Sequence, residues 1–455
     1  MRPSAARPLV VLLPLGLAAL LAGAGLAALT SSPGPGPVAG FGSASPVAAV
    51  PSAGPGASTS PSLPTSPAPS AVPGPPTPSP AVPTPSPSPA VPSAPPSASP
   101  SAPVDIPPHD SAKFGFAAKG MRGEVMAFAT IPELVYARDT LDFSAVSTLA
   151  FFSLQAGADG MLLHDSRWRA WNGVLFDAVR DRAHAAGTRV VVSVSRFSWS
   201  PDETAVTRAL LASSARRERL AREIAAEVVR RGVDGVNVDL EPVPVGQKAA
   251  FTSFVRQLRA ALDDAAPGLQ LTVAITGYYS SYDAHGLVAP GAADAIYVMG
   301  YHYAGWWSKI AGSNAPLGGP RYNVADTIAK LRADGVPAER LIVGVPYYGH
   351  LWPTASAALN ARTIGQGSDV RLVSALAILA NVTPRWDPVQ DVTWAAWREN
   401  GTWVQLYVDD PRALAAKWRR FRQLGLLGTG MWTIGFEGAP GAANDALREA
   451  WLAGP

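Results

Sequence analysis

The chain has 455 residues, no cysteine, and a formal net charge of +3 from 37 basic and 34 acidic residues. The absence of cysteine excludes disulfides, iron–sulfur clusters, cysteine-ligated zinc and thiol catalysis. Arg2 and Arg7 supply two of the three net charges, so the rest of the chain is nearly neutral. We therefore expect it to bind neither nucleic acid nor, by charge, a membrane surface.

The first predicted element is an apolar segment of 21 residues, 9–29, which follows Arg2 and Arg7. At helical rise it is about 31 Å long, enough to cross a bilayer. Its first part also has the length of a signal-peptide core, and small residues follow it. Residues 1–32 are therefore either a cleaved signal peptide or a membrane anchor. In both cases the positive flank predicts that the remainder lies outside the cytoplasmic membrane, either secreted or tethered.

Residues 33–112 form the second predicted region, which is rich in proline, serine and alanine. Of the 45 prolines, 27 fall within residues 1–104, and Phe41 is the only aromatic residue there. Such a composition cannot bury enough apolar surface to offset the entropy of folding. It favours an extended polyproline II conformation, so we predict a disordered linker. A ligand for proline-recognition domains is the less favoured alternative.

Short apolar segments alternate with amphipathic helical segments throughout residues 113–455. The predicted strands are 124–129, 148–154, 189–195, 233–240, 271–276, 295–301, 341–345 and 428–433. Helical stripes of apolar residues are predicted at 216–231, 251–262, 324–331 and 414–424. Eight strands with helical crossovers predict an α/β fold of the (β/α)8 TIM-barrel type, with an open doubly wound sheet as the alternative.

The predicted strand at 233–240 carries polar residues where a barrel interior is normally apolar. Because side chains alternate between faces, Asn237, Asp239 and Glu241 share one face. The polar series runs toward the C-terminal end of the strand, where barrel active sites form. Asp239 and Glu241 lie about 7 Å apart by backbone rise, so each disfavours ionisation of the other. This arrangement predicts a protonated Glu241 at neutral pH, as general acid catalysis requires.

A site for a hard cation and an exposed turn with scattered acidic residues are the alternative interpretations of these carboxylates. No further acidic residue ends another predicted strand at a spacing that pairs with Asp239 or Glu241. We therefore expect no metal ion at this site.

These residues resemble the strand-4 signature D-x-x-D-x-D-x-E of glycoside hydrolase family 18, the chitinase-like family. The four positions are occupied by Asp234, Asn237, Asp239 and Glu241. Three more segments are similar to family elements in the same order: Met299-Gly300-Tyr301 on strand 6, Gly344-Val345-Pro346-Tyr347-Tyr348-Gly349 on strand 7, and Gly430-Met431-Trp432 on strand 8. The segment Gly157-Ala158-Asp159-Gly160, together with Asn237, is similar to the branch that contains spore-cortex and peptidoglycan-lytic enzymes.

The resemblance implies a retaining hydrolysis in which the substrate's own 2-acetamido group attacks the anomeric carbon. It implies that Glu241 is the proton donor, that Asp239 and Tyr301 orient the acetamide, and that Trp432 forms the floor under the sugar. Asn237, Met299, His302 and Tyr348 complete the implied substrate-binding residues. No cofactor is implied. The implied partner is a β-1,4-linked polysaccharide containing N-acetylglucosamine, either peptidoglycan or chitin.

Two positions depart from the family pattern. Asn237 replaces an aspartate, and we expect its amide to hold Asp239 by a hydrogen bond with weaker pKa coupling. His302 stands where an aspartate usually follows the strand-6 tyrosine, and it either donates to the substrate or shifts the pH optimum through its charge. The segment Ser193-Val194-Ser195-Arg196 also lacks the usual glycine pair. A glycan-binding protein that has lost turnover therefore remains the alternative function.

Aromatic residues follow the predicted strands 5, 6 and 7, where barrel loops contact ligands. The candidates for a binding cleft are Tyr278, Tyr279, Tyr282, Trp306, Trp307, Tyr347 and Trp352. A region predicted to be an added hairpin contains Trp386, Trp394, Trp397 and Trp403, for which core packing is the favoured role.

Overall fold

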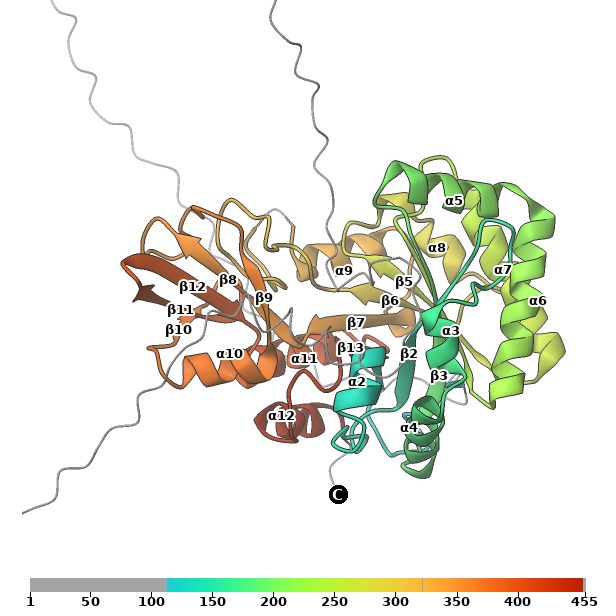
Figure 1. The fold of residues 1–455 in the computed structure, drawn as a ribbon, viewed down its shortest axis with the longest axis horizontal. Coiled ribbons are helices and arrows are strands. Elements are labelled where there is room, and N and C mark those ends of the chain that lie inside the picture. Colours follow the sequence, from blue (N-terminus) through green and yellow to red (C-terminus); the bar gives the residue numbers. More distant parts are fainter. Residues whose placement is uncertain (1–112, 321, 453–455) are drawn as a thin grey trace, which may run out of the picture. The chain divides into compact units, whose positions relative to one another are not determined.

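The structure of the protein is a computed structural model that describes residues 113–320 and 322–452 (Figure 1). For Tyr279 it describes the backbone and not the side chain. The predicted export segment, residues 1–32, and the predicted linker, residues 33–112, lie outside the described residues. Within the described range, no helix combines the length and the apolar character that crossing a bilayer requires.

Eight parallel strands form a closed barrel in the order β1-β13-β7-β6-β5-β4-β3-β2. The barrel strands are β1 (Glu124–Thr130), β2 (Thr148–Gln155), β3 (Arg189–Phe197), β4 (Gly235–Glu241), β5 (Gln270–Thr276), β6 (Ala295–Met299), β7 (Leu341–Pro346) and β13 (Gly428–Trp432). Each corresponds to a predicted strand, with ends that differ by two residues or fewer. The closed barrel confirms the (β/α)8 prediction and excludes the open sheet.

Helices connect the barrel strands. They are α2 (Ile131–Tyr136), α3 (Ser166–Trp171), α4 (Val174–Ala185), α5 (Pro201–Ala212), α6 (Ser214–Arg231), α7 (Lys248–Ala265), α8 (Ala284–Leu287), α9 (Val324–Ala333), α11 (Pro411–Gln423) and the C-terminal α12 (Ala442–Trp451), with short 3-10 helices at Tyr279–Ser281 and Ala338–Arg340. The four predicted helical stripes lie in α6, α7, α9 and α11.

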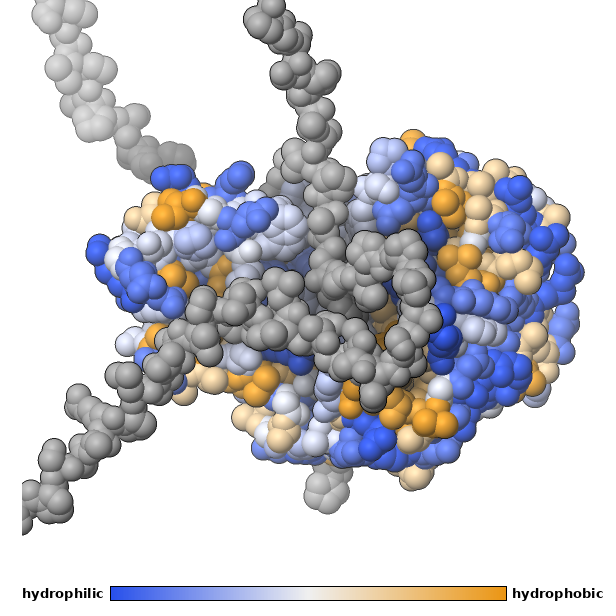
Figure 2. Space-filling view, viewed as in Figure 1, coloured by the Kyte–Doolittle hydropathy of each residue, from blue (hydrophilic) through white to orange (hydrophobic). Residues whose placement is uncertain are grey.

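Helix α6 illustrates why these segments fold as they do. Its N-cap, Ser213, accepts a hydrogen bond from the Arg216 N–H, and its C-cap is Gly232, whose φ of 59° suits glycine. Leu220, Ile224 and Val228 recur on one face and are fully buried in the core. The opposite face carries many of the charged residues of α6, and Figure 2 shows hydrophilic residues interspersed with apolar ones over this part of the surface.

A second sheet is inserted between β7 and α11. Its five antiparallel strands have the order β10-β11-β12-β8-β9 (Figure 1, orange to red). The elements of the insertion are β8 (Tyr348–Thr354), β9 (Ser368–Arg371), α10 (Leu372–Leu379), β10 (Arg385–Asp387), β11 (Val392–Glu399) and β12 (Thr402–Val408). The predicted hairpin exists as β11 and β12, but it is only part of this sheet.

The tryptophans of the insertion pack less uniformly than expected. Trp394 is buried and stacks on Tyr407 with ring centroids 5.8 Å apart, in a small second core with Trp352. Trp386, Trp397 and Trp403 are only half-buried. The prediction of core packing is therefore confirmed for Trp394 and for Trp397, which packs against the main core while half-buried, and not for Trp386 or Trp403.

Candidate active site

The C-terminal end of β4 brings two carboxyl groups together inside the barrel. Asp239 is 3% exposed, and Glu241 is half-buried at the last position of the strand. Their strand partners on β3 are Ser195 and Phe197. The structure therefore places both carboxylates where the alternation of side chains predicted them.

The two carboxyl groups interact through a hydrogen bond and shift each other's pKa. Burial raises the pKa of Glu241 well above its usual value, and the charge of Asp239 and their mutual hydrogen bond raise it further. Burial also raises the pKa of Asp239, while the hydrogen bond from Glu241 lowers it. The shift favours the protonated form of Glu241 over that of an ordinary glutamate, which is the direction that general acid catalysis requires.

Asp239 also has spare capacity to accept a hydrogen bond. Apart from the Glu241 carboxyl, no group among the described residues donates a hydrogen bond to its buried Oδ1. Leaving a buried carboxylate oxygen without a donor is costly, so this atom is suited to accept a hydrogen bond from a ligand.

Asn237 lies one step deeper in the barrel and is fully buried. Its Nδ2 donates to Ser193 Oγ on β3 at 3.3 Å, and its Oδ1 accepts from Thr272 Oγ1 on β5 at 2.9 Å. The hydrogen bond to Asp239 that we expected is not formed among the described residues. The amide ties β4 to both neighbouring strands instead, because it lies between a hydroxyl group of β3 and one of β5.

Tyr301 and Met299 point into the barrel from the end of β6. Their exposed fractions are 5% and 9%. The Tyr301 ring lies 6.4 Å from the ring of Tyr348, which begins the inserted sheet. Burial raises the pKa of the Tyr301 phenol well above its usual value, and nearby Tyr297 and Tyr348 add to this shift. Tyr301 is therefore a neutral hydrogen-bond donor at any working pH.

Two glycines make room for the aromatic floor of the barrel. A Cβ atom at Gly344 of β7 or at Gly430 of β13 would collide with the ring of Tyr297. The Tyr297 ring in turn contacts Phe128, with centroids 4.8 Å apart. The two glycines of the strand-7 and strand-8 segments therefore accommodate a large side chain inside the barrel.

His302 follows Tyr301 and lies at the mouth of the site. Its backbone has a φ of 65°, and its N–H donates to Asn314 Oδ1 at 2.7 Å. The ring is crowded by Trp307 and Tyr348, with centroids 6.2 and 5.9 Å away.

The His302 residue is exposed at the edge of the site. Its pKa is lowered to about 4, chiefly because neighbouring groups displace water from the ring and also because of His350, against the opposing charge of Asp369. His302 is thus neutral at physiological pH. The expected shift of the pH optimum by a charged histidine is not supported. Its partner Asn314 was not among the predicted site residues, because it lies in a loop that no sequence pattern links to β6.

Trp432 ends β13 and packs on two rings at the top of the barrel. Its indole is perpendicular to Phe152 at 4.7 Å and lies 5.7 Å from Phe128. The side chain is nevertheless only half-buried. Trp432 therefore presents a fixed aromatic surface at the same end of the barrel as the carboxyl pair, as a sugar platform requires.

The remaining aromatic candidates divide into two groups. Tyr278 and Trp307 are 44% and 43% exposed and are available to a ligand, and Trp306 is half-buried. Tyr282, Tyr347 and Trp352 are buried packing residues, and Trp352 lies within β8 rather than in a loop. The side chain of Tyr279 lies outside the described residues.

The site has no resident metal cluster in the described residues, because no three His, Asp or Glu side chains there converge in a geometry that would hold an ion. Its chemistry consists of a buried carboxyl pair, a neutral tyrosine and aromatic surfaces. This set can donate a proton, accept a hydrogen bond from an amide and stack on a sugar ring.

A sequence model described as glycosyl hydrolases family 18 matches residues 125–437. A probable endochitinase of Caenorhabditis elegans is 28% identical over 279 residues, covering 55% of this chain and 44% of the relative. The putative sporulation-specific glycosylase YdhD of Bacillus subtilis is 28% identical over 268 residues, covering 55% and 59%. The chain thus spans about half the length of these curated relatives.

Solved structures share the fold. A family 18 chitinase from Cycas revoluta in complex with (GlcNAc)3 has a TM-score of 0.64 at 18% identity, covering 72% of this chain and 99% of that one. Human YKL-39, described as a pseudo-chitinase with retained chitooligosaccharide binding, has a TM-score of 0.62 at 18% identity with the same coverage. The structural matches therefore include both a chitinase and a protein described as a pseudo-chitinase.

Proposed function

Because the chain belongs to glycosyl hydrolases family 18, we propose that it is a glycosidase that hydrolyses β-1,4 bonds next to N-acetylglucosamine. The observation that carries this proposal is the carboxyl pair at the end of β4. Burial and the neighbouring Asp239 raise the pKa of Glu241 and so favour its protonated form, which suits it to serve as a general acid. A chain that only bound glycans would have no use for such a proton donor.

In the first step Glu241 gives its proton to the glycosidic oxygen as the bond to the anomeric carbon breaks. The substrate's acetamide oxygen attacks the same carbon and forms a cyclic oxazolinium ion. The buried Oδ1 of Asp239 accepts the acetamide N–H and stabilises the positive charge. The neutral hydroxyl of Tyr301 donates to the acetamide oxygen and aligns it for attack.

In the second step the Glu241 carboxylate removes a proton from water. The resulting oxygen attacks the anomeric carbon and opens the oxazolinium ring, so the original configuration is retained. Trp432 holds the sugar ring from below throughout, and Met299, His302 and Tyr348 line the same mouth. Asn237 acts beneath them by fixing β4 against β3 and β5.

We propose bacterial peptidoglycan as the substrate ahead of chitin, and a place outside the cytoplasmic membrane. The similarity to a sporulation-specific glycosylase and the segment 157–160 favour the wall polymer. The apolar residues 9–29 and the proline-rich residues 33–112 are consistent with an exported or tethered chain, in which the linker spans the distance to the polymer.

A glycan-binding protein without turnover is the second candidate. It is favoured by one observation, the replacement of a signature aspartate by Asn237, together with the similarity in fold to YKL-39. The presence of Glu241 beside Asp239 supports hydrolysis over this alternative.

The test compares the wild type with Glu241→Gln on N-acetylated chitooligosaccharides and on purified peptidoglycan, with product masses recorded. We expect the wild type to cleave at least one of them, and Glu241→Gln to lose activity by about 10²- to 10⁴-fold. Glu124→Gln, the same change at a buried carboxyl at the opposite end of the barrel, is the matched control and should retain activity. Binding without cleavage by the wild type would establish the second candidate. Inhibition by a thiazoline analogue of the oxazolinium ion tests substrate assistance.

A further inference from the structure

The catalytic end of β4 is held differently on its two sides. Toward β3, strand pairing continues to Phe197 opposite Glu241, and the Ser198 N–H donates to the Glu241 carbonyl at 2.7 Å. Toward β5, pairing ends at Val238 opposite Val273. Successive carbonyls of a strand point to opposite sides, so the carbonyl of Leu240 faces β5 beyond the last paired residue.

Tyr282 supplies the donor that β5 does not. Its hydroxyl donates to the Leu240 carbonyl at 2.9 Å, from the segment that connects β5 to β6. Leu240 is the residue between Asp239 and Glu241, so this hydrogen bond fixes the backbone from which both carboxyl groups extend. Without this bond, the buried Leu240 carbonyl would lose the hydrogen-bond donor that Tyr282 supplies on that side.

The Tyr282 side chain is itself firmly held. It is 3% exposed, and its ring packs edge-on against Phe251 of α7 with centroids 6.0 Å apart. Burial raises the pKa of Tyr282 well above its usual value, and the charges of Glu241 and Asp239 raise it further. The hydroxyl therefore stays protonated and remains a donor over the whole range in which the carboxyl pair titrates.

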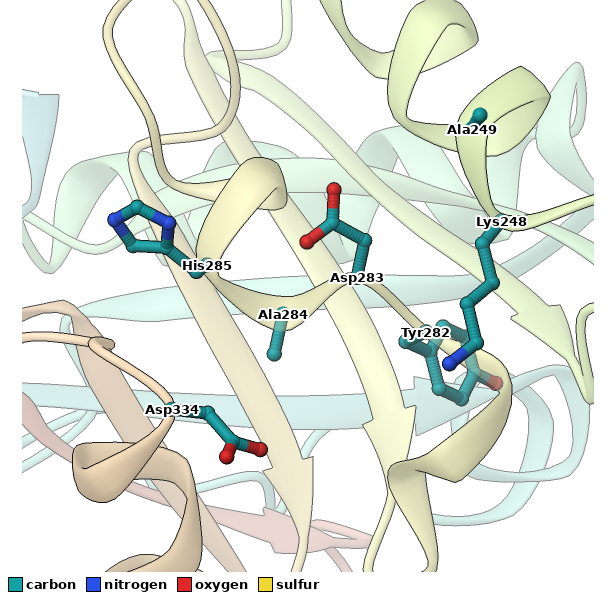
Figure 3. A pocket seen from close by; sticks show the side chains of 7 residues that line it. All are labelled: Lys248, Ala249, Tyr282, Asp283, Ala284, His285 and Asp334. Carbon is teal, nitrogen blue, oxygen red and sulfur yellow. The ribbon is translucent and has the colours of Figure 1, made fainter.

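The other face of Tyr282 borders a pocket on the outside of the barrel. The pocket has a volume of about 420 Å³ and is lined also by Lys248 and Ala249 of α7, the segment 283–285, and Asp334 (Figure 3). It is distinct from the candidate active site, and the hydroxyl of Tyr282 reaches from its wall to β4.

We infer that Tyr282 is a positioning residue, which holds Glu241 and Asp239 in register by anchoring the Leu240 carbonyl. This inference rests on the proposed hydrolysis. Without the hydroxyl, the end of β4 is fixed on the β3 side only, and the Glu241 carboxyl is free to turn toward water. Better solvation of its charged form weakens the proton donor.

The test is Tyr282→Phe, which removes one oxygen and keeps the ring on Phe251. We expect kcat to fall about tenfold, the order of a single hydrogen bond, while KM stays within about twofold. The alkaline limb of the kcat profile should move to lower pH. Tyr407→Phe is the matched control, because it also removes a buried hydroxyl that is hydrogen-bonded, to Asn360 in the inserted sheet. Equal effects of the two changes, or an unshifted alkaline limb, would overturn the inference.

A second readout separates this inference from the proposed function. If the wild type cleaves neither glycan, the proposed hydrolysis fails, but the inference about Tyr282 can still be tested. The titration of the Glu241 carboxyl is then followed by carbon-13 NMR. The Glu241→Gln variant identifies the resonance of that carboxyl by its absence. We expect Tyr282→Phe to lower the pKa of that carboxyl and Tyr407→Phe to leave it unchanged. An identical titration in Tyr282→Phe and the wild type would show that the hydroxyl does not position the pair.

Discussion

Lys417 of α11 and Asp409, which directly follows β12, form a fully buried ion pair with 2.7 Å between Nζ and Oδ1. The Lys417 ammonium also donates to the carbonyl of Asp391 at 3.2 Å. One side chain from a barrel helix thus binds two points of the inserted sheet. A charged pair that is removed from water depends on its partners, so it fixes the position of the sheet on α11.

Asp409→Asn should destabilise the protein strongly, because Lys417 would remain buried without a counter-charge. We expect a loss of about 3–5 kcal/mol in the free energy of unfolding, measured by urea denaturation. The double change Lys417→Met with Asp409→Leu should cost less than either single change. Asp334→Asn, which breaks an exposed pair with Lys330, is the control and should change the midpoint little. A similarly small effect of Asp409→Asn would contradict the role of the buried pair.

Stability should fall between about pH 4.5 and pH 7 because of Glu124. Burial raises the pKa of this fully buried carboxyl to about 7, although Thr148, Ser147 and Arg189 oppose the shift. In this window the unfolded chain has lost the proton that the folded chain keeps, so raising the pH favours unfolding.

Glu124→Gln removes this contribution. Between about pH 4.5 and pH 7, the free energy of unfolding should therefore fall by roughly 2–3 kcal/mol less in the variant than in the wild type. Thermal melts in a pH series of wild type and variant measure it. Glu339→Gln, at an exposed carboxyl, serves as the control and should leave the slope as it is. A wild-type slope that persists in Glu124→Gln would assign the effect to other buried carboxyls.

Restoring the family residue with Asn237→Asp should move the pH–activity profile to higher pH. The new carboxylate at position 237 would lie below Asp239, and its negative charge would disfavour ionisation of the carboxyl pair. It would therefore raise the pKa values that set the acid and alkaline limbs of the pH–activity profile. The variant should also be less stable at neutral pH, because the new carboxylate is fully buried. Profiles of kcat against pH, compared with Asn444→Asp at a distant buried asparagine, test this expectation. An unshifted profile would mean that position 237 is not coupled to the pair.

His302→Gln should leave the shape of the pH profile between pH 5 and 8 unchanged. The pKa of His302 is lowered to about 4 by loss of water and by His350, so the ring carries no charge in that range. We expect the change to appear in KM, because the ring lies at the mouth of the site. The disappearance of a limb between pH 6 and 7 in the variant would show that His302 titrates there after all.

The barrel and the carboxyl pair could be predicted from sequence because both depend on local alternation. Each barrel strand is a short apolar run, and the faces of Asn237, Asp239 and Glu241 follow from their spacing. The role of Tyr282 could not be predicted, because the hydrogen bond to Leu240 joins a loop to a strand 42 positions away. The inserted sheet was underestimated because β9 and β10 are four and three residues long, too short for a pattern.

The low pKa of His302 was also beyond prediction from sequence. Its environment combines Trp307 and Tyr348 with His350 of β8, and their convergence depends on how the inserted sheet folds. The same limit applies to Asn237, whose expected partner Asp239 is two residues away. Its actual partners come from β3 and β5 and become neighbours only when the barrel closes.

The barrel is closed by the pairing of its first strand with its last. Glu124 lies opposite Gly428, more than 300 positions later in the chain. Until the ribosome has released β13, both β1 and β7 have an unpaired edge, and the ring cannot form. The newly made chain is therefore incomplete as a fold until β13 has been synthesised. A translocation channel that accepts only unfolded polypeptide would find this chain in a state that it can thread.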